Sequence, residues 1–407
     1  MKTCFIFANK RCELFDLSQD VYQKKFKFIW VIKEKDEKNI PKETQKFLEK
    51  KYTIELGEYV EYYNIVKNEI NSITDINDVR IVCTDENSLL IAAKLREELG
   101  IKGAKIEDIN KFRDKDLMKK ELQAKGIRVP KYIKLNSSIQ IASIEKEFYN
   151  AVEYVGIPFI IKPIDGASSV STELIKDLNQ FVKFFKKIKR GEYLLEEFIS
   201  GRMFHCDTFF YNGKVQFSAV SEYTWPNLDH CEGKTLGSLL VSKTDKNHDR
   251  FIEYNKKVLE AYQAINGAYH LEFILKGDEI VFIEIGARPV GALTSNLLLK
   301  NFSINLYDLT LRNELELELN IKIQKDLYHS WYWLPRYPGK IKNIFLPNLQ
   351  SEVIYKEINV SEGEEIIEYP KSIVDAASIV LILKNHDYNK MQEDFNTLKY
   401  CKPLIMG

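Results

Sequence analysis

No run of apolar residues in this chain of 407 residues approaches the ~20 residues that a membrane-spanning helix needs. The longest run, Ala376–Leu383, is interrupted by a serine. The apolar opening residues meet Asn9-Lys10-Arg11 too soon for the core of a signal peptide, which takes ~7–15 apolar residues. The six cysteines include no CxxC pair, which argues against a disulfide framework or a zinc ribbon. These absences predict a soluble cytoplasmic protein with no membrane partner.

An excess of one charge is lacking too. The chain has 59 Lys plus Arg and 59 Asp plus Glu, whereas proteins that bind nucleic acid are usually basic. Hydrophobic residues make up 45% and aromatic residues 12%, which is too much for a disordered chain. The length and composition predict two or three globular domains that bind no nucleic acid.

Short apolar runs alternate with helical patterns through the first third of the chain. Thr3–Ala8, Phe26–Ile32 and Val79–Cys83 are typical of buried strands, and Ser88–Leu99 has a helical apolar face that Gly100 ends. Strands that alternate with helices indicate a parallel α/β sheet. Farther along, a helix predicted over 113–125 is followed by hairpins and helices typical of an α+β arrangement, including a strand at Val170–Ile175.

Two carboxylates, Glu272 and Glu284, lie in consecutive apolar strands joined by a turn, so the hairpin can bring them side by side. Like charges in apolar surroundings repel one another unless a cation or strong donors compensate them. A hard divalent cation such as Mg²⁺ prefers such oxygen ligands. The pair predicts a metal site, with ordinary solvent-facing strand positions as the alternative.

Three cationic side chains, Arg288, Lys162 and Lys115, lie at positions where they could bind an anion. Arg288 follows the second carboxylate among glycines, where a guanidinium can bind an anion. Lys162 ends an apolar strand before the loop Asp165-Gly166-Ala167-Ser168-Ser169, whose backbone N–H groups and hydroxyls suit a phosphate. Lys115 opens a helix. The alternative for each is a solvated surface residue.

Five short motifs follow one another in an order that is typical of a known family. Asp-Lys-x-x-Met at 114–118, Ile-Ile-Lys-Pro at 160–163, Leu-Glu-Glu-Phe-Ile-x-Gly at 195–201, His-x-Glu at 270–272 and Glu-Ile-x-x-Arg-x-x-Gly at 284–291 follow one another. This order resembles the ATP-grasp superfamily, and more closely its carboxylate–amine ligases of the L-amino acid (dipeptide) ligase type, over about residues 79–310. The resemblance implies an ATP-grasp fold: a Rossmann-like pre-ATP-grasp domain at 1–110, an ATP-grasp domain at 111–325 with a lid subdomain at about 130–198, and a small α+β domain at 326–407.

The resemblance also implies roles for the residues. ATP and Mg²⁺, or Mn²⁺ in its place, would be the cofactors, with Glu272 and Glu284 as metal ligands and Arg288 binding first the substrate carboxylate and then the acyl-phosphate. The position two residues after Gly201, where relatives often have a ribose-binding glutamate, is Met203, and Glu197 is the alternative ribose contact. The residues implied to bind the nucleotide are Lys115, Lys162, Ser168, Ser169, Glu196, Glu197, Phe198, Ile199 and Met203.

The implied reaction converts a carboxylate and ATP into an acyl-phosphate, which an amine then attacks. Both substrates would be small molecules, and the protein a homodimer. His270 would orient the amine or accept its proton, with a hydrogen-bonded core histidine as the alternative. The segment 221–242, with Tyr223, Trp225, His230 and Glu232, would select the substrate, with an ordinary surface loop that has one aromatic anchor as the alternative. The alternatives for function are a carboxylating or purine-biosynthetic ATP-grasp enzyme and a non-catalytic nucleotide-binding module.

Overall fold

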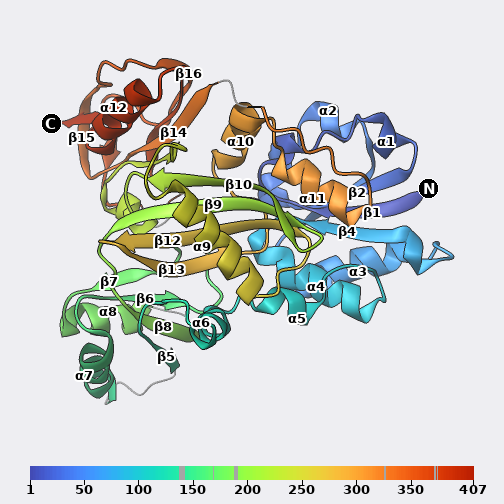
Figure 1. The fold of residues 1–407 in the computed structure, drawn as a ribbon, viewed down its shortest axis with the longest axis horizontal. Helices are drawn as coiled ribbons and strands as arrows, with labels where there is room; N and C mark the ends of the chain where they lie inside the picture. The colour runs from blue at the N-terminus through green and yellow to red at the C-terminus, as the bar shows by residue number, and fades with distance from the viewer. Residues whose placement is uncertain (137–142, 168, 188–190, 325–326, 371–372, 374) are drawn as a thin grey trace.

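The first domain is a parallel sheet with helices on both faces (Figure 1). It comprises β1 (Lys2–Phe7), α1 (Asp20–Gln23), β2 (Phe26–Lys33), α2 (Lys42–Gln45), β3 (Leu48–Ile54), α3 (Tyr59–Ile70), β4 (Val79–Cys83), α4 (Leu89–Glu98) and α5 (Ile106–Asn110). The strand order is β3-β2-β1-β4. The computed structural model describes residues 1–136, 143–167, 169–187, 191–324, 327–370, 373 and 375–407.

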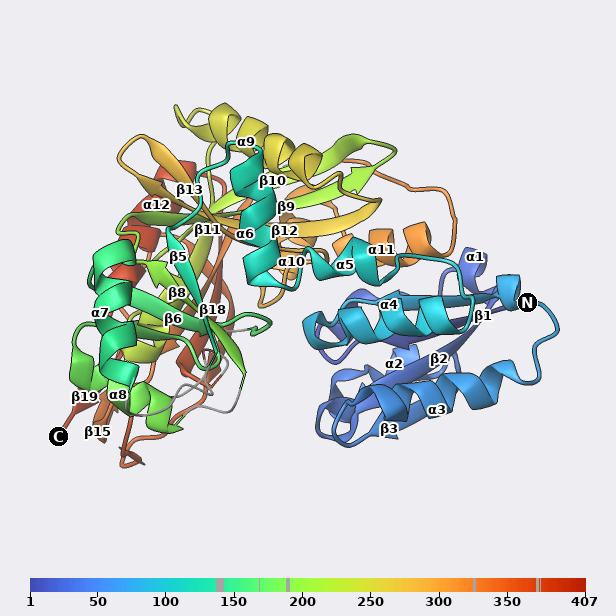
Figure 2. The same cartoon turned by 90° about the horizontal axis from the view of Figure 1, so that it is seen from below.

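The strands β1, β2 and β4 are mostly apolar and buried, as expected where helices cover both faces of a sheet, whereas the edge strand β3 is largely polar and exposed. Helices α3 and α4 cover one face. The other face packs against α11 (Leu306–Glu314), from much later in the chain, whose Tyr307 and Leu311 join a cluster with Ile6 and Trp30. The first domain is therefore anchored to the rest of the molecule through its own core, although Figure 2 shows it to one side.

A small antiparallel sheet of order β5-β8-β6-β7 follows, with α7 and α8 packed on it. Its elements, with the preceding helix, are α6 (Lys115–Ala124), β5 (Tyr132–Asn136), α7 (Ile144–Val155), β6 (Phe159–Pro163), β7 (Glu173–Ile175), α8 (Leu178–Lys187) and β8 (Glu192–Glu197). The predicted strand from Val170 is wrong at its start. Ser169 and Ser171 both have a φ of 56°, so the backbone turns there and the strand begins at Glu173.

The largest sheet in the described part of the chain has the order β13-β12-β9-β10-β11-β14-β18-β16. Strands from the predicted third domain pair with strands of the ATP-grasp region in it, since β14 joins β11. The remaining elements are β9 (Arg202–Tyr211), β10 (Lys214–Tyr223), β11 (Leu236–Leu240), α9 (His248–Ala261), β12 (Gly267–Lys276), β13 (Glu279–Gly286), α10 (Thr294–Phe302), β14 (Tyr328–Pro335), β15 (Gly339–Ile344), β16 (Glu352–Ile358), β17 (Glu365–Ile366), β18 (Ala377–Asn385), α12 (Tyr388–Lys399) and β19 (Leu404–Met406).

Strands β9, β12 and β13 separate apolar from polar residues, because successive side chains point to opposite faces of a sheet. Phe204, Leu271 and Ile285 turn to one face and pack with α9 in the main core. Polar residues at alternating positions turn to the other face, which therefore carries the chemistry. Among the described helices, none is both long and apolar enough to cross a bilayer.

Candidate active site

Glu272 and Glu284 lie directly opposite each other on the antiparallel strands β12 and β13. Directly opposite residues on such strands have Cβ atoms about 4.5–5.5 Å apart, so the two carboxylates stand side by side. A like-charge pair at this distance is unfavourable without compensation. The structure thus brings together the two carboxylates that the sequence predicts as metal ligands.

A cavity of about 510 Å³ is lined by residues of the small sheet and of the large sheet. Ser168 lies outside the described residues. The other residues predicted to form the site all line this cavity: Lys115, Lys162, Ser169, Glu196, Glu197, Phe198, Ile199, Met203, His270, Glu272, Glu284 and Arg288. The ligase hypothesis requires these side chains, from distant stretches of the chain, to share one cavity, and they do.

A buried ion-pair network lies on the small-sheet side of the cavity. Nζ of Lys162 is 3.0 Å from Oε2 of Glu196, and Nζ of Lys119 is 2.9 Å from Oε1. Burial lowers the pKa of Lys119 to about 8, although the charge of Glu196 opposes this shift. Glu196, predicted to line the adenine and ribose pocket, therefore has its carboxylate paired with lysines. Lys119 was not predicted, but it follows Lys115 by one turn on the same face of α6, and this spacing indicates it.

Lys115 connects the carboxylate pair to the small-residue loop. Its Nζ donates a hydrogen bond to the carbonyl of Gly166 at 2.7 Å and lies 3.6 Å from Oε2 of Glu284. Burial alone would raise the pKa of Glu284, but the charges of Lys115, Lys162 and Lys119 lower it to about 2. The carboxyl group of Glu284 is therefore ionised at neutral pH and available to a cation.

Glu272 is held through one of its two oxygens. Asn227 donates to Oε1 at 2.9 Å, and Tyr223 and His270 lie 3.3 Å from the same oxygen. No described residue bonds Oε2. An oriented carboxylate with one free oxygen, beside a second carboxylate, is a suitable donor set for Mg²⁺.

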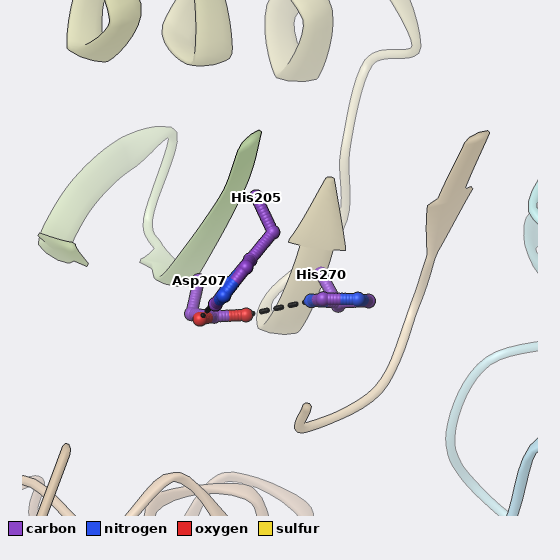
Figure 3. A group of neighbouring side chains, drawn as sticks. All are labelled: His205, Asp207 and His270. Carbon is purple, nitrogen blue, oxygen red and sulfur yellow. Dashed lines mark hydrogen bonds and ion pairs between the residues drawn. The ribbon is translucent and has the colours of Figure 1, made fainter. Parts of the chain in front are cut away.

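His270 has both ring nitrogens next to carboxylates. Nδ1 lies 2.7 Å from Oδ1 of Asp207 (Figure 3). Nε2 lies 3.3 Å from Oε1 of Glu272. Burial alone would lower the pKa of His270, but hydrogen bonds to Asp207 and Glu272 raise it to about 9. Because a ring that donates from both nitrogens has no lone pair, the geometry favours a positioning role over acceptance of the amine proton.

Arg288 is held by a carboxylate from the first domain. Glu86, in the turn after β4, pairs with Nε of Arg288 and with Nη1 of Arg113, and Arg113 Nη2 donates to the carbonyl of Asp165 at 2.6 Å. Nη1 of Arg288 donates to the carbonyl of Pro289, and Nη2 has no partner among the described residues. The guanidinium is therefore oriented, with one nitrogen left for an anion in the cavity.

Glu86 and Arg113 were not predicted as site residues. The position of Glu86 in a polar turn directly after a buried strand was the available indication. Gly286 lies beside Glu86: a Cβ there would be 3.3 Å from Oε2 of Glu86. The glycine leaves room for the carboxylate that holds Arg288.

The apolar end of the cavity includes Phe198, Ile199 and Met203. Ile199 and Met203 belong to a cluster of buried apolar side chains. Oε2 of Glu197 accepts hydrogen bonds from Arg128 Nη2 at 2.7 Å and from the backbone of Lys131 at 3.0 Å. An apolar wall that ends in an oriented carboxylate is suited to a flat base and a sugar hydroxyl.

The segment predicted to select the substrate is divided by the structure. Tyr223 and Glu232 line the cavity, whereas Trp225 lines a neighbouring cavity of about 530 Å³ and donates from Nε1 to the carbonyl of Lys399. His230 is buried, with Nδ1 2.7 Å from the carbonyl oxygen of Lys234. Trp331 and Trp333 on β14 complete this side of the cavity and were not predicted to do so.

Comparisons with known proteins agree with this geometry. A family model described as an ATP-grasp domain matches residues 112–292. The chain is 28% identical over 321 residues to an "L-arginine-specific L-amino acid ligase" of Bacillus subtilis, covering 75% of this chain and 76% of that protein. It is 26% identical over 315 residues to an "alanine–anticapsin ligase" of Bacillus subtilis, covering 69% of this chain and 64% of that protein.

A solved structure extends the likeness to the whole fold. The crystal structure of an L-amino acid ligase from Bacillus licheniformis superposes with a TM-score of 0.75 at 17% sequence identity, covering 100% of this chain and 99% of that chain. The predicted resemblance and the predicted fold class are thus confirmed. Residues 112–292 match the ATP-grasp domain family, and the chain as a whole is similar to amino acid ligases.

Proposed function

We propose that the protein activates the carboxylate of an amino acid with ATP, as an acyl-phosphate, and couples it to an amine to give an amide or dipeptide, ADP and phosphate. The observation that carries this proposal is the side-by-side pair Glu272 and Glu284 in one cavity with Lys115, Lys162 and Arg288. The names of the two curated relatives, an L-amino acid ligase and a ligase of alanine, support an amino acid as the activated carboxylate.

Glu272 and Glu284 would hold Mg²⁺, or Mn²⁺ in its place. The donor set fits, because both carboxylates face one cavity and Oε2 of Glu272 is free of described partners. When bound, the cation neutralises phosphate charge.

Lys115 and Lys162 would contact the phosphates. Each ammonium group has three N–H donors, and Lys162 uses one on Glu196, so donors remain for phosphate oxygens. The loop that ends in Ser169 lies beside Lys115 through Gly166 and would cover the phosphates. Together these groups bring two anions, the carboxylate and the γ-phosphate, close enough to react.

Arg288 would bind the substrate carboxylate through Nη2 and later stabilise the oxyanion that forms when the amine attacks. Glu86 would hold the guanidinium in the orientation this requires. The adenine would lie against Phe198, Ile199 and Met203, with Glu197 toward the ribose.

The test is an ADP-release screen with ATP, Mg²⁺ and all pairs of amino acids, followed by mass spectrometry of the products. The proposal expects ADP only when an acid and an amine are both present, with a product mass equal to their sum less water. ADP formed with bicarbonate instead would favour a carboxylating enzyme. Nucleotide binding without ADP from any mixture would favour a non-catalytic module.

The domain limits at 110 and 325, the cytoplasmic location and the homodimer stay predictions. Limited proteolysis tests the first, and light scattering on the purified protein tests the last. Small-molecule substrates agree with the names of the curated relatives.

A further inference from the structure

A chain of polar side chains runs through the large sheet to Glu272. Ser238 Oγ lies 2.8 Å from Nε2 of His205, and Nδ1 of His205 lies 2.8 Å from Oδ2 of Asp207. Oδ1 of Asp207 lies 2.7 Å from Nδ1 of His270, which in turn faces Oε1 of Glu272. Figure 3 shows the two histidines on neighbouring strands, both directed at the carboxylate between them.

The inner part of this chain is completely buried. His205 and Asp207 have no exposed surface, and Ser238 is 2% exposed. A carboxylate or imidazole in such a place is unfavourable unless its polar atoms are hydrogen-bonded. Nothing in the proposed reaction uses His205 or Asp207, because neither lines the cavity.

The strand register explains why the chain ends at the carboxylate pair. His205 on β9 lies opposite Glu272 on β12, which lies opposite Glu284 on β13. Asp207 lies opposite His270 in the adjacent row. The hydrogen bonds therefore step between two rows of the same sheet face and reach the first metal carboxylate.

The chemistry of the groups sets the direction of the bonds. An ionised carboxylate only accepts hydrogen bonds, so Asp207 fixes the Nδ1–H of both histidines, and Nε2 of His270 must face Glu272. Oε1 of Glu272 also receives the amide of Asn227, so this oxygen is committed to protein donors.

A second metal site at His205, Asp207 and His270 is the competing interpretation. One potential ligand atom from each lies within 4.8 Å of the others. However, the oxygens of Asp207 are 2.7 and 2.8 Å from the ring nitrogens, which is ordinary N–H···O distance, so direct hydrogen bonds account for all three groups without an ion.

We propose that Asp207 and His205 are positioning residues for the metal site: they fix the ring of His270 and thereby Oε1 of Glu272, so that Oε2 is presented to the divalent cation. This inference rests on the proposed metal site. Hydrogen-bond partners behind metal ligands typically contribute about 10–100-fold to metal affinity.

The test measures Mn²⁺ binding to the full-length protein by electron paramagnetic resonance, with ADP and without it. Asp207→Asn replaces one accepting oxygen by an N–H donor and is expected to weaken Mn²⁺ binding about tenfold or more. The Mg²⁺ concentration for half-maximal turnover should rise by a similar factor, with the rate recovered at high Mg²⁺. A purely structural role would give neither shift.

Asp394→Asn is the matched control. Asp394 is 2% exposed and accepts hydrogen bonds from the backbone of Gln350 and Ser351 in the C-terminal region, away from the cavity. This variant should lose stability but keep wild-type Mn²⁺ affinity. If Asp207→Asn does not fold, Ser238→Ala removes the far end of the chain and should still weaken Mn²⁺ binding measurably.

The outcomes separate this inference from the proposed function. The positioning role is overturned if Asp207→Asn folds and binds Mn²⁺ as tightly as wild type. If Asp207→Asn does not fold, the same result for folded Ser238→Ala overturns it. In that case, loss of Mn²⁺ binding in Glu284→Gln would still support the proposed metal site. Absence of a Mn²⁺ site in the wild-type protein, both alone and with ADP, would overturn both.

Discussion

The two sheets that line the cavity differ in how the negative charge of their buried carboxylates is compensated. On the small sheet, Glu196 has two lysines within 3.0 Å. On the large sheet, two carboxylates, Glu272 and Glu284, have Lys115 as the nearest lysine, 3.6 Å from Glu284. Glu272 is otherwise held by hydrogen bonds from Tyr223, Asn227 and His270.

The difference indicates where a cation is needed. The Glu196 network is a nearly complete set of charges, and a buried carboxylate with two partners has no need of a ligand. Glu272, Glu284 and Asp207 together carry three negative charges, against the two cations Lys115 and His270 that contact them. A divalent cation would complete this set, and the lysines of the first network would then serve the phosphates that accompany the cation.

The largest effect is expected where the under-compensated pair is broken. Glu284→Gln keeps the shape but removes one metal-binding charge, so Mg²⁺-dependent turnover should fall at least about 10³-fold, the scale of a metal ion's contribution to transition-state stabilisation. Circular dichroism should show an intact fold. Glu253→Gln, on the exposed face of α9, is the control and should turn over like wild type. Normal turnover in Glu284→Gln would refute the metal assignment.

On the lysine side, Lys162→Met removes one of the two charges on Glu196 and a predicted phosphate contact. Turnover per KM for ATP should fall about 10²–10³-fold, as for loss of one oriented donor at a charged transition state. The fold should persist because Lys119 still pairs with Glu196. Lys183→Met, an exposed lysine on α8, serves as control. Equal activity of the two variants would mean that Lys162 serves Glu196 alone.

The Glu196 network should also respond to alkaline pH. The pKa of Lys119 is about 8 in the folded protein against 10.5 for a free lysine. Between these values the unfolded chain binds more protons than the folded one, so this residue makes the folded state more stable as pH rises. Relative to Lys119→Met, the wild-type free energy of unfolding should gain up to about 3 kcal/mol from pH 8 to 10.5 by denaturant titration. Parallel pH curves would contradict this pKa.

The smallest effect is expected at the support of Arg288. Glu86→Gln replaces the charged partner of Arg288 by a neutral one. A charged hydrogen bond exceeds a neutral one by about 1–1.5 kcal/mol, so KM for the carboxylate substrate should rise about tenfold. Nucleotide affinity should stay within about twofold of wild type. Glu98→Gln, on the exposed end of α4, is the control. If Glu86→Gln weakens nucleotide affinity more than it raises KM for the carboxylate substrate, Arg288 contacts the nucleotide phosphates instead.

Local sequence patterns predict well the residues whose strand or helix is marked by a turn or by the spacing of apolar residues. The sequence places Glu272 and Glu284 on consecutive strands of a hairpin. The turn that pairs Lys276 with Glu279 would by itself set Glu272 opposite Ile283, and the bulge between Glu272 and Phe273 brings Glu284 opposite Glu272. The helix spacing around Lys115 similarly predicted its place at the start of α6.

The residues missed are placed by contacts between distant segments. Glu86 meets Arg288 only because the first domain packs beside the β13 loop, and no local pattern encodes that contact. His205 and Asp207 could have been noticed as alternate polar positions in the apolar strand β9. Their link to Glu272, however, depends on β9 pairing with β12, a non-consecutive strand.

The most direct test of the central claim is the position of manganese in crystals of the protein grown with MnADP, located by its anomalous scattering. The account predicts a peak within coordination distance of both Glu272 and Glu284, with nucleotide phosphates beside Lys115 and Lys162. A well-ordered nucleotide in this cavity whose manganese contacts neither carboxylate, or a nucleotide bound elsewhere, would contradict it.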